Sequence, residues 1–196
     1  MADAFSQWIE PRVVLTKAQQ GVFDELQCAR LDLPFPLLGI HSDSGSEFIN
    51  DQLYRYCHAE HLRFTRGRAG KKNDNARVEQ KNWSVVRHFA GYGRYETQEQ
   101  VEQLNAAYAM VRLYVNFFKP VVKLQAKRRI GSKVKRVYDK PKTPCQRLLE
   151  CKSLSRTDKQ KLEAMFRCLR LSKVKAELDR RLAALKPSRI FTDNYS

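Results

Sequence analysis

Apolar residues in this chain follow two patterns, short extended runs and longer stretches with an apolar residue at every third or fourth position. Together they predict the strands and helices of an α/β protein. Strands are expected at Trp8–Leu15, Leu37–Ser42 and Leu62–Thr65. The first run mixes β-branched and aromatic residues, and its Pro11 indicates an edge strand or a bulge. The second is short and largely apolar, which is typical of a buried parallel strand.

The helices are marked by capping residues and by apolar stripes. They are expected at 16–30, at 50–61 and from Thr97 to just before Pro120. A further helix holds Glu79 in its first turn and runs to Phe89, with Asn73, Asp74 or Asn75 as its cap. Three shorter helices begin at Thr143, Ser155 and Ser172. Thr97 and Gln100 have the spacing of a capping box, and the helix that follows is the longest. Its apolar stripe should pack in the core. The last two helices are expected to face each other in a helical hairpin of open role.

A basic segment follows the longest helix. Residues 119–140 hold nine Lys or Arg against the single Asp139, and Gly131-Ser132 lies between two runs with β propensity, so the segment predicts a β-hairpin. Contact with a DNA backbone would explain these cations, because phosphates require little else. A merely solvated charged face would explain them equally well. The candidate contacts are Lys127, Arg128, Arg129, Lys133, Lys135 and Arg136.

The whole chain is basic. Among its 196 residues, 37 Lys and Arg stand against 21 Asp and Glu, a net charge of +16 that points to nucleic acid or an anionic membrane surface. No apolar run approaches the roughly 20 residues of a spanning helix, and no secretory signal is visible, so a cytoplasmic, nucleoid-associated protein is expected. The five cysteines are odd in number and are interpreted as buried thiols. Cys57, His58 and His61 lack the second ligand pair of a zinc finger.

Two acids suggest a metal site. Asp43 closes the second strand, Glu79 lies in the first turn of a helix, and 35 residues separate them. Carboxylates brought together in this way would hold Mg²⁺, which prefers oxygen ligands. The basic loop between them, with Arg66, Arg68, Lys71 and Lys72, would neutralise substrate phosphates. Without further context, Asp43 is equally a turn residue and Glu79 a charge favoured by the helix dipole.

The sequence segments around these acids resemble those of a known family. HSDSGSEF, followed after this interval by NARVEQKNW, resembles the second and third acidic residues of the retroviral-integrase-type catalytic core, an aspartate-aspartate-glutamate triad on an RNase H-like fold. The flanking YCHAEHLRFTRGR, GYGRYET, NFFKP and GSKVKRVYDKPKTPCQRLLE are similar to bacterial insertion-sequence transposases. The resemblance covers about residues 3–185.

The resemblance implies a function in DNA transposition and integration. The intact parent would cut a phosphodiester at an element's end and use the freed 3′-hydroxyl to attack target DNA. Asp43 and Glu79 would be the catalytic ligands of two Mg²⁺ or Mn²⁺ ions, and Arg66, Arg68, Lys71, Lys72, Lys81 and Asn82 would contact DNA.

One departure from the family changes the expected fold. The family's first catalytic aspartate lies on a strand before the segment that resembles ADAFSQWIE, and only seven residues precede Trp8 here. We therefore expect an N-terminally truncated, incomplete RNase H-like fold of class α/β: a mixed sheet flanked by helices at 1–118, a basic hairpin at 119–142 and a helical region at 143–196. Met1 would then be an internal methionine of a longer reading frame.

The missing aspartate leaves alternatives to an active enzyme. None of the early acids is positioned to replace it: Asp3, Glu10, Asp24, Glu25 and Asp32. The chain could be a non-catalytic DNA-binding remnant, or an assembly subunit that pairs with itself or with a full-length transposase. An incomplete sheet should fold poorly alone, close by other pairings or take strands from another chain.

Overall fold

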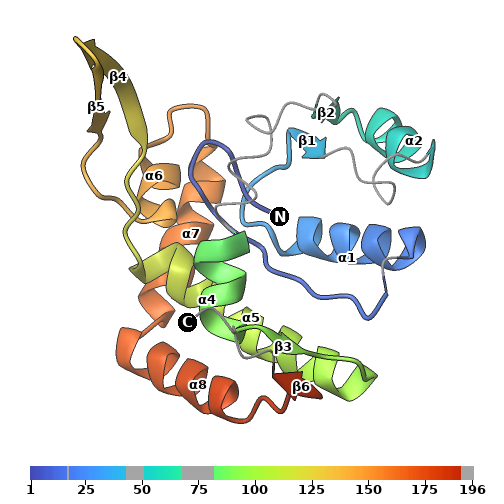
Figure 1. Ribbon diagram of the computed structural model, residues 1–196. Helices are drawn as coiled ribbons and strands as arrows, with labels where there is room; N and C mark the ends of the chain where they lie inside the picture. The colour runs from blue at the N-terminus through green and yellow to red at the C-terminus, as the bar shows by residue number, and fades with distance from the viewer. Residues whose placement is uncertain (17, 43–50, 68–81, 191–196) are drawn as a thin grey trace.

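A computed structural model describes residues 1–16, 18–42, 51–67 and 82–190 (Figure 1). The protein is mixed α/β, and the strands of these ranges form two-stranded sheets. Within the same ranges, no helix combines the length and the apolar character needed to cross a membrane.

A strand-helix-strand unit contains the first sheet. β1 (Gly39–Ser42) and β2 (Arg63–Arg66) are parallel and in register from Gly39 opposite Arg63 to Ser42 opposite Arg66, and α2 (Asp51–Ala59) lies between them in sequence. The predicted strands and helix are confirmed here, with ends shifted by a few residues. A side chain at Gly39 would place its Cβ 2.6 Å from the Arg63 carbonyl oxygen, so this close pairing requires glycine.

The first helix packs against this unit. α1 (Gln19–Asp32) contributes Phe23 and Leu26 to a cluster around the buried Leu53, Cys57 and Leu62. The helix was expected to start at residue 16, but α1 begins three residues later, and its first residue follows Ala18, which provides no side-chain cap. The predicted start is therefore wrong, although the helix itself is confirmed.

The long helix α5 (Gln98–Phe118) lies at the centre of the helices formed by the C-terminal half of the chain (Figure 1). Both hydrogen bonds of the Thr97–Gln100 capping box are present, and the buried residues of the predicted stripe include Val111 and Val115. The C-terminal helices are α6 (Pro144–Glu150), α7 (Arg156–Cys168) and α8 (Leu171–Ala183). α8 runs along α5 (Figure 1).

The two last helices bury their leucines in different clusters. Leu162 of α7 packs with Trp8 and Phe117, whereas Leu178 of α8 packs with Ile9 and Val111. The prediction that the apolar faces of α7 and α8 pack against each other in a helical hairpin is therefore wrong. Both helices cover the core instead, because α5 offers an apolar surface on more than one side.

The predicted strand at Trp8–Leu15 is also wrong. Within this segment only Ile9 forms a β-bridge, with Ala2. Asparagine amides of α5 occupy the place of a strand partner: Asn116 receives the Ile9 N–H at 2.9 Å and donates to the Ile9 carbonyl at 2.8 Å. Asn105 does the same for Val13, at 2.9 and 3.0 Å. The segment Trp8–Leu15 is thus hydrogen-bonded to a helix rather than to a sheet, and we call it the N-terminal strap.

Of the helix expected to run to Phe89, the structure describes the part from Asn82 onward. A π-helical turn, η3 (Asn82–Arg87), continues into α4 (His88–Ala90), and Gly91 follows with φ of +68°, a conformation suited to glycine. Val85 anchors this helix in the α5 core. β3 (Gly93–Arg94) then pairs antiparallel with β6 (Arg189–Ile190).

Candidate nucleic-acid interface

The basic segment forms the predicted β-hairpin. β4 (Leu124–Ile130) pairs antiparallel with β5 (Lys133–Tyr138), and Ile130 opposite Lys133 leaves Gly131 and Ser132 as a two-residue turn. Gly131 has φ of +61°, which a hairpin turn with glycine in its first central position requires. In Figure 1 the hairpin projects from the helical body at upper left.

The register assigns the six predicted cations equally to the two faces of the hairpin. Residues directly opposite in an antiparallel pair share a face, and alternate residues of a strand share it too. One face, called face A, carries Arg128, Lys133 and Lys135. The other, face B, carries Lys127, Arg129 and Arg136.

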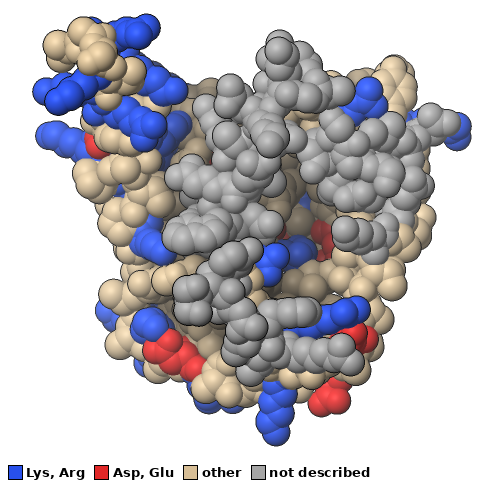
Figure 2. Space-filling model, viewed as in Figure 1, with Lys and Arg blue, Asp and Glu red and all other residues tan. Residues whose placement is uncertain are grey.

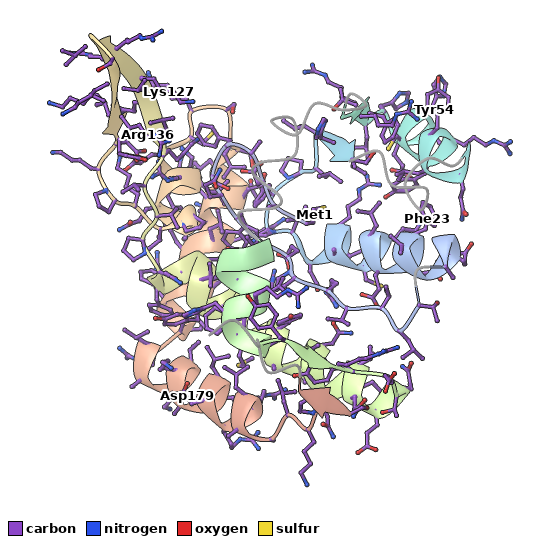
Figure 3. The ribbon with its side chains drawn as sticks, viewed as in Figure 1. Met1, Phe23, Tyr54, Lys127, Arg136 and Asp179 are labelled. Atoms are coloured by element: carbon purple, nitrogen blue, oxygen red, sulfur yellow. The ribbon has the colours of Figure 1, made fainter. Side chains whose placement is uncertain are left out.

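All six side chains are exposed, and none forms an ion pair within the described ranges. Arg129 donates to the Gly131 carbonyl at 3.3 Å, which leaves its charge unneutralised. Figure 2 shows blue side chains gathered over the hairpin, and Figure 3 labels Lys127 and Arg136 on the neighbouring strands. The hairpin is therefore a concentrated positive surface.

Two like-charge pairs stand directly across the strands. Lys127 is opposite Arg136, and Arg128 is opposite Lys135, one pair on each face. Like charges in this position destabilise a hairpin, and a two-stranded hairpin is only marginally stable in isolation. A bound polyanion would relieve the repulsion between the paired cations, because each phosphate contact neutralises one of them. The charge arrangement thus suits a ligand with closely spaced phosphates.

An ion pair anchors the base of the hairpin. Arg147 of α6 donates to Asp139 at 2.5 and 3.2 Å and to the Val121 carbonyl at 2.7 Å. The Lys123 N–H donates to the same carboxylate at 2.6 Å. These bonds join the strand ends to the helical body. The hydrogen bonds from Arg147 and then from the Lys123 backbone lower the pKa of Asp139 to about 2.

The lowered pKa of Asp139 predicts how the base responds to acid. A carboxyl whose folded pKa lies below its unfolded value stabilises the folded state above the unfolded pKa, and this contribution is lost as the pH falls toward the folded pKa. We expect the Lys123 amide resonance to titrate in NMR spectra with a midpoint of about 2. The Asp139→Asn variant is the control, since it cannot titrate; a wild-type midpoint near 3.8, the ordinary pKa of an Asp carboxyl, would contradict the anchor.

Arg147 is the residue of this interface that the sequence reasoning missed. It is buried, and its partner Asp139 was noted only as the one acid of a basic segment. A lone acid among nine cations was the available signal, because a carboxylate in a basic surrounding favours an ion pair with a nearby Arg or Lys.

The edge where Asp43 was expected is described only in part. Ser42 is buried, its carbonyl accepts the Gly67 N–H at 2.9 Å, and it lies opposite the exposed Arg66 in the parallel pair. The structure therefore places Arg66, one predicted DNA contact, beside the residue that precedes Asp43. The remaining predicted residues of this site lie outside the described residues: Asp43, Glu79, Arg68, Lys71, Lys72 and Lys81. Asn82 begins η3, and its side chain is not described.

The other acids considered for the site have structural roles. Asp3 accepts from the Ser6 N–H at 2.6 Å and from its hydroxyl at 2.5 Å, Asp32 pairs with Arg12, and Glu10 is buried beside Arg112. Across the described part of the chain, no group of three His, Cys, Asp or Glu side chains could hold a metal ion. All five cysteines are free, as predicted, but only Cys57 and Cys145 are buried.

Comparison with known proteins gives one informative similarity. The chain is similar to y4rM, an uncharacterized protein of Sinorhizobium fredii (strain NBRC 101917 / NGR234), with 41% identity over 147 residues. This alignment spans 75% of the chain and 42% of the relative's length. No family model matches the chain.

Proposed function

We propose that this protein binds duplex DNA through the β4–β5 hairpin, as part of the machinery of DNA transposition. The observation that carries the proposal is the set of six exposed cations on faces A and B, without ion-pair partners among the described residues. Phosphate contacts supply most of the affinity of non-specific DNA binding, and they require cations that are free to meet phosphates.

The resemblance to insertion-sequence transposases supports duplex DNA over other polyanions. DNA is the substrate of that class, and the chain's charge of +16 suits it. An anionic membrane surface fits less well, because surface-bound helices combine a basic face with a broad apolar one. The hairpin instead carries cations on both faces, and its exposed apolar residues at the turn end, Ile130 and Val134, form no continuous face.

Equilibrium binding as a function of salt tests this function. A fluorescein-labelled duplex of about three helical turns should bind with an affinity that falls steeply with salt. If all six hairpin cations meet phosphates, the slope of log K against log salt is about −5 from the hairpin alone, since each contact contributes about −0.9. Absence of binding at low salt, or binding that salt does not weaken, would contradict the proposal.

We further propose that the β1–α2–β2 unit belongs to an RNase H-like catalytic core. Two parallel strands joined through a helix, with Asp43 directly after the first strand, support this assignment. Asp43 and Glu79 would be the metal ligands, since carboxylate oxygens suit Mg²⁺ and Mn²⁺. Two such ions activate the attacking oxygen and stabilise the leaving one in phosphoryl transfer. Arg66, beside this strand end, would hold a substrate phosphate.

A nicking assay separates strand cleavage from DNA binding alone. Under the catalytic function, the chain nicks supercoiled plasmid only with Mg²⁺ or Mn²⁺, and Asp43→Asn or Glu79→Gln each lowers the rate by several orders of magnitude. Duplex binding by the hairpin should persist in both variants. Nicking that survives Asp43→Asn would exclude the assigned role of this carboxylate.

The second candidate function is a non-catalytic DNA-binding or assembly subunit. It is favoured by the hairpin's own charge, because its six cations belong to β4 and β5 and are present whether or not Asp43 and Glu79 bind a metal. Salt-dependent binding without any nicking would support a binding subunit. Co-purification with a full-length transposase would support the assembly role.

A further inference from the structure

We propose that the hairpin enters the major groove of duplex DNA tip first, with faces A and B turned toward opposite sugar-phosphate walls. This mode of binding rests on the proposed DNA-binding function and adds to it where the DNA lies. Three properties of the hairpin carry it: the division of charge, the thickness of the ribbon and the position of its apolar tip.

The equal division of cations between the faces argues against a hairpin that lies flat on DNA. A flat ribbon would bring one set of three cations to the phosphates and turn the other set toward solvent. Each face instead holds three cations and one cross-strand like-charge pair, Arg128–Lys135 on face A and Lys127–Arg136 on face B. Phosphates on both sides would relieve both pairs, and a groove is the part of duplex DNA that provides two such walls.

The dimensions of the ribbon select the major groove. A strand pair with side chains on both faces is about 10 Å thick, judged from the spacing of packed sheets. The major groove of B-form DNA is about 12 Å wide and admits a two-stranded ribbon, whereas the minor groove is about 6 Å wide. β4 has seven residues and spans roughly 20 Å, while the groove is about 8.5 Å deep. Only the turn end therefore reaches the bases.

The residues at the turn end suit the groove floor. Ile130 is 65% exposed and adjoins Gly131, so an apolar side chain stands at the tip. Such a side chain can contact thymine methyl groups, which lie in the major groove. Ser132 beside it can donate a hydrogen bond to a base edge. The three cations of each face would contact the phosphates of the groove walls.

Comparison of duplex DNA with duplex RNA of the same sequence tests the inserted mode. A-form RNA has a deep, narrow major groove that side chains do not enter, so wild-type protein should bind DNA at least about tenfold more tightly. Methyl green, which occupies the major groove, should compete with the protein, and netropsin, which occupies the minor groove, should not. Equal affinity for RNA and DNA, or competition by netropsin alone, overturns the insertion. If duplex DNA is not bound at all, the proposed function fails as well.

Two face variants test the division of charge. Replacement of the three face A cations with glutamine, and separately of the three face B cations, should lower the salt slope by about 2.7 units each. A flat hairpin predicts that one of the two variants binds like wild type, and that result overturns the proposal. Ile130→Ala should weaken duplex binding severalfold, whereas Leu171→Ala, exposed at the start of α8, should leave it unchanged. Equal affinity of Ile130→Ala and wild type excludes contact at the tip.

Discussion

Replacing all six hairpin cations with glutamine is expected to weaken duplex-DNA binding at least a thousandfold near 0.1 M salt. Each phosphate contact contributes about 0.9 to the slope of log K against log salt, so loss of six contacts removes about five orders of magnitude at that concentration. Contacts made elsewhere on the chain set the residual affinity. The six replacements are Lys127, Arg128, Arg129, Lys133, Lys135 and Arg136.

The fold should tolerate these replacements. All six side chains are exposed, and their removal deletes two cross-strand repulsions. Circular dichroism and the midpoint of urea unfolding should therefore match those of the wild type. These measurements separate loss of the interface from loss of the structure.

A control variant must lower the net charge equally without touching the hairpin. Six cations of the helical body serve this purpose when changed to glutamine: Lys152, Arg156, Lys161, Arg170, Lys173 and Lys186. We expect this variant to keep most of the affinity and most of the salt slope, since distant charges act through a screened field. If both variants lose affinity equally, general charge explains binding and the hairpin is not its site.

The hairpin was predictable from sequence because its determinants are local. Gly131 supplies the positive φ of the turn, and the flanking runs have β propensity. The same holds for the capping box of Thr97 and Gln100, whose two hydrogen bonds span only three residues. Features of this kind depend on neighbours in the chain and are largely independent of the tertiary fold.

The segment Trp8–Leu15 was mispredicted because its partner is distant in sequence. Its composition favours a strand, but strand formation requires another strand, and α5 presents asparagine amides instead. Each amide combines an NH₂ donor group with an acceptor oxygen, so Ile9 and Val13 satisfy both of their backbone groups without a sheet. The tertiary contacts with α5 therefore outweighed the β propensity of this segment.

A signal for this strap was present in the sequence of α5. Asn105, Arg112 and Asn116 follow one another at intervals of seven and four residues, the spacing of a single helix face. Polar residues with this spacing, interleaved with a buried apolar stripe, indicate polar partners inside the protein. The identity of those partners could not be deduced, because Ile9 and Val13 lie about a hundred residues away.

The candidate interface also contains features that the sequence predicted and features that it did not. The β-hairpin was expected and is confirmed, whereas contact of its cations with DNA stays a prediction. The pairing of β1 with β2 places Arg66 opposite Ser42, the residue before Asp43 in the sequence, whereas the sequence pattern had put Arg66 in a loop. Asp43 and Glu79 themselves lie outside the described residues, and their role rests on the family resemblance.

The largest effect on stability is expected for Arg112→Leu. Glu10 is only 1% exposed, and its carboxylate accepts hydrogen bonds from Trp8 Nε1 at 2.8 Å and from Arg112 Nε at 2.7 and 2.6 Å. Removal of the guanidinium leaves a buried carboxylate without its ion-pair partner. Breaking a buried pair in this way costs about 3–5 kcal/mol, which urea unfolding at neutral pH can measure.

The lost interactions extend beyond the ion pair. Arg112 also donates to the Asp32 carbonyl at 2.5 Å, and its guanidinium lies 5.9 Å from the centre of the Trp8 ring. Arg112 therefore ties α5 to the N-terminal segment and to the end of α1. A destabilised strap should expose Trp8, so tryptophan fluorescence should shift to the red in the variant before global unfolding.

Acidification should restore part of the stability of Arg112→Leu. Burial raises the pKa of Glu10, and Arg112 acts against this by favouring the charged form. Without Arg112 the folded pKa rises further above the unfolded value. The folded variant then binds the proton more tightly than the unfolded chain, so its free energy of unfolding increases as the pH falls from neutral through the folded pKa.

A second replacement distinguishes the buried charge from lost packing. Glu10→Gln combined with Arg112→Leu removes both charges and keeps an acceptor for Trp8, so the double variant should be more stable than Arg112→Leu at neutral pH. Its stability should also lose the pH dependence assigned to Glu10. Arg156→Leu, at an exposed position of α7, should change stability by no more than about 0.5 kcal/mol. A double variant as unstable as Arg112→Leu, with the same pH profile, would show that packing by Arg112 and not the charge of Glu10 governs the strap.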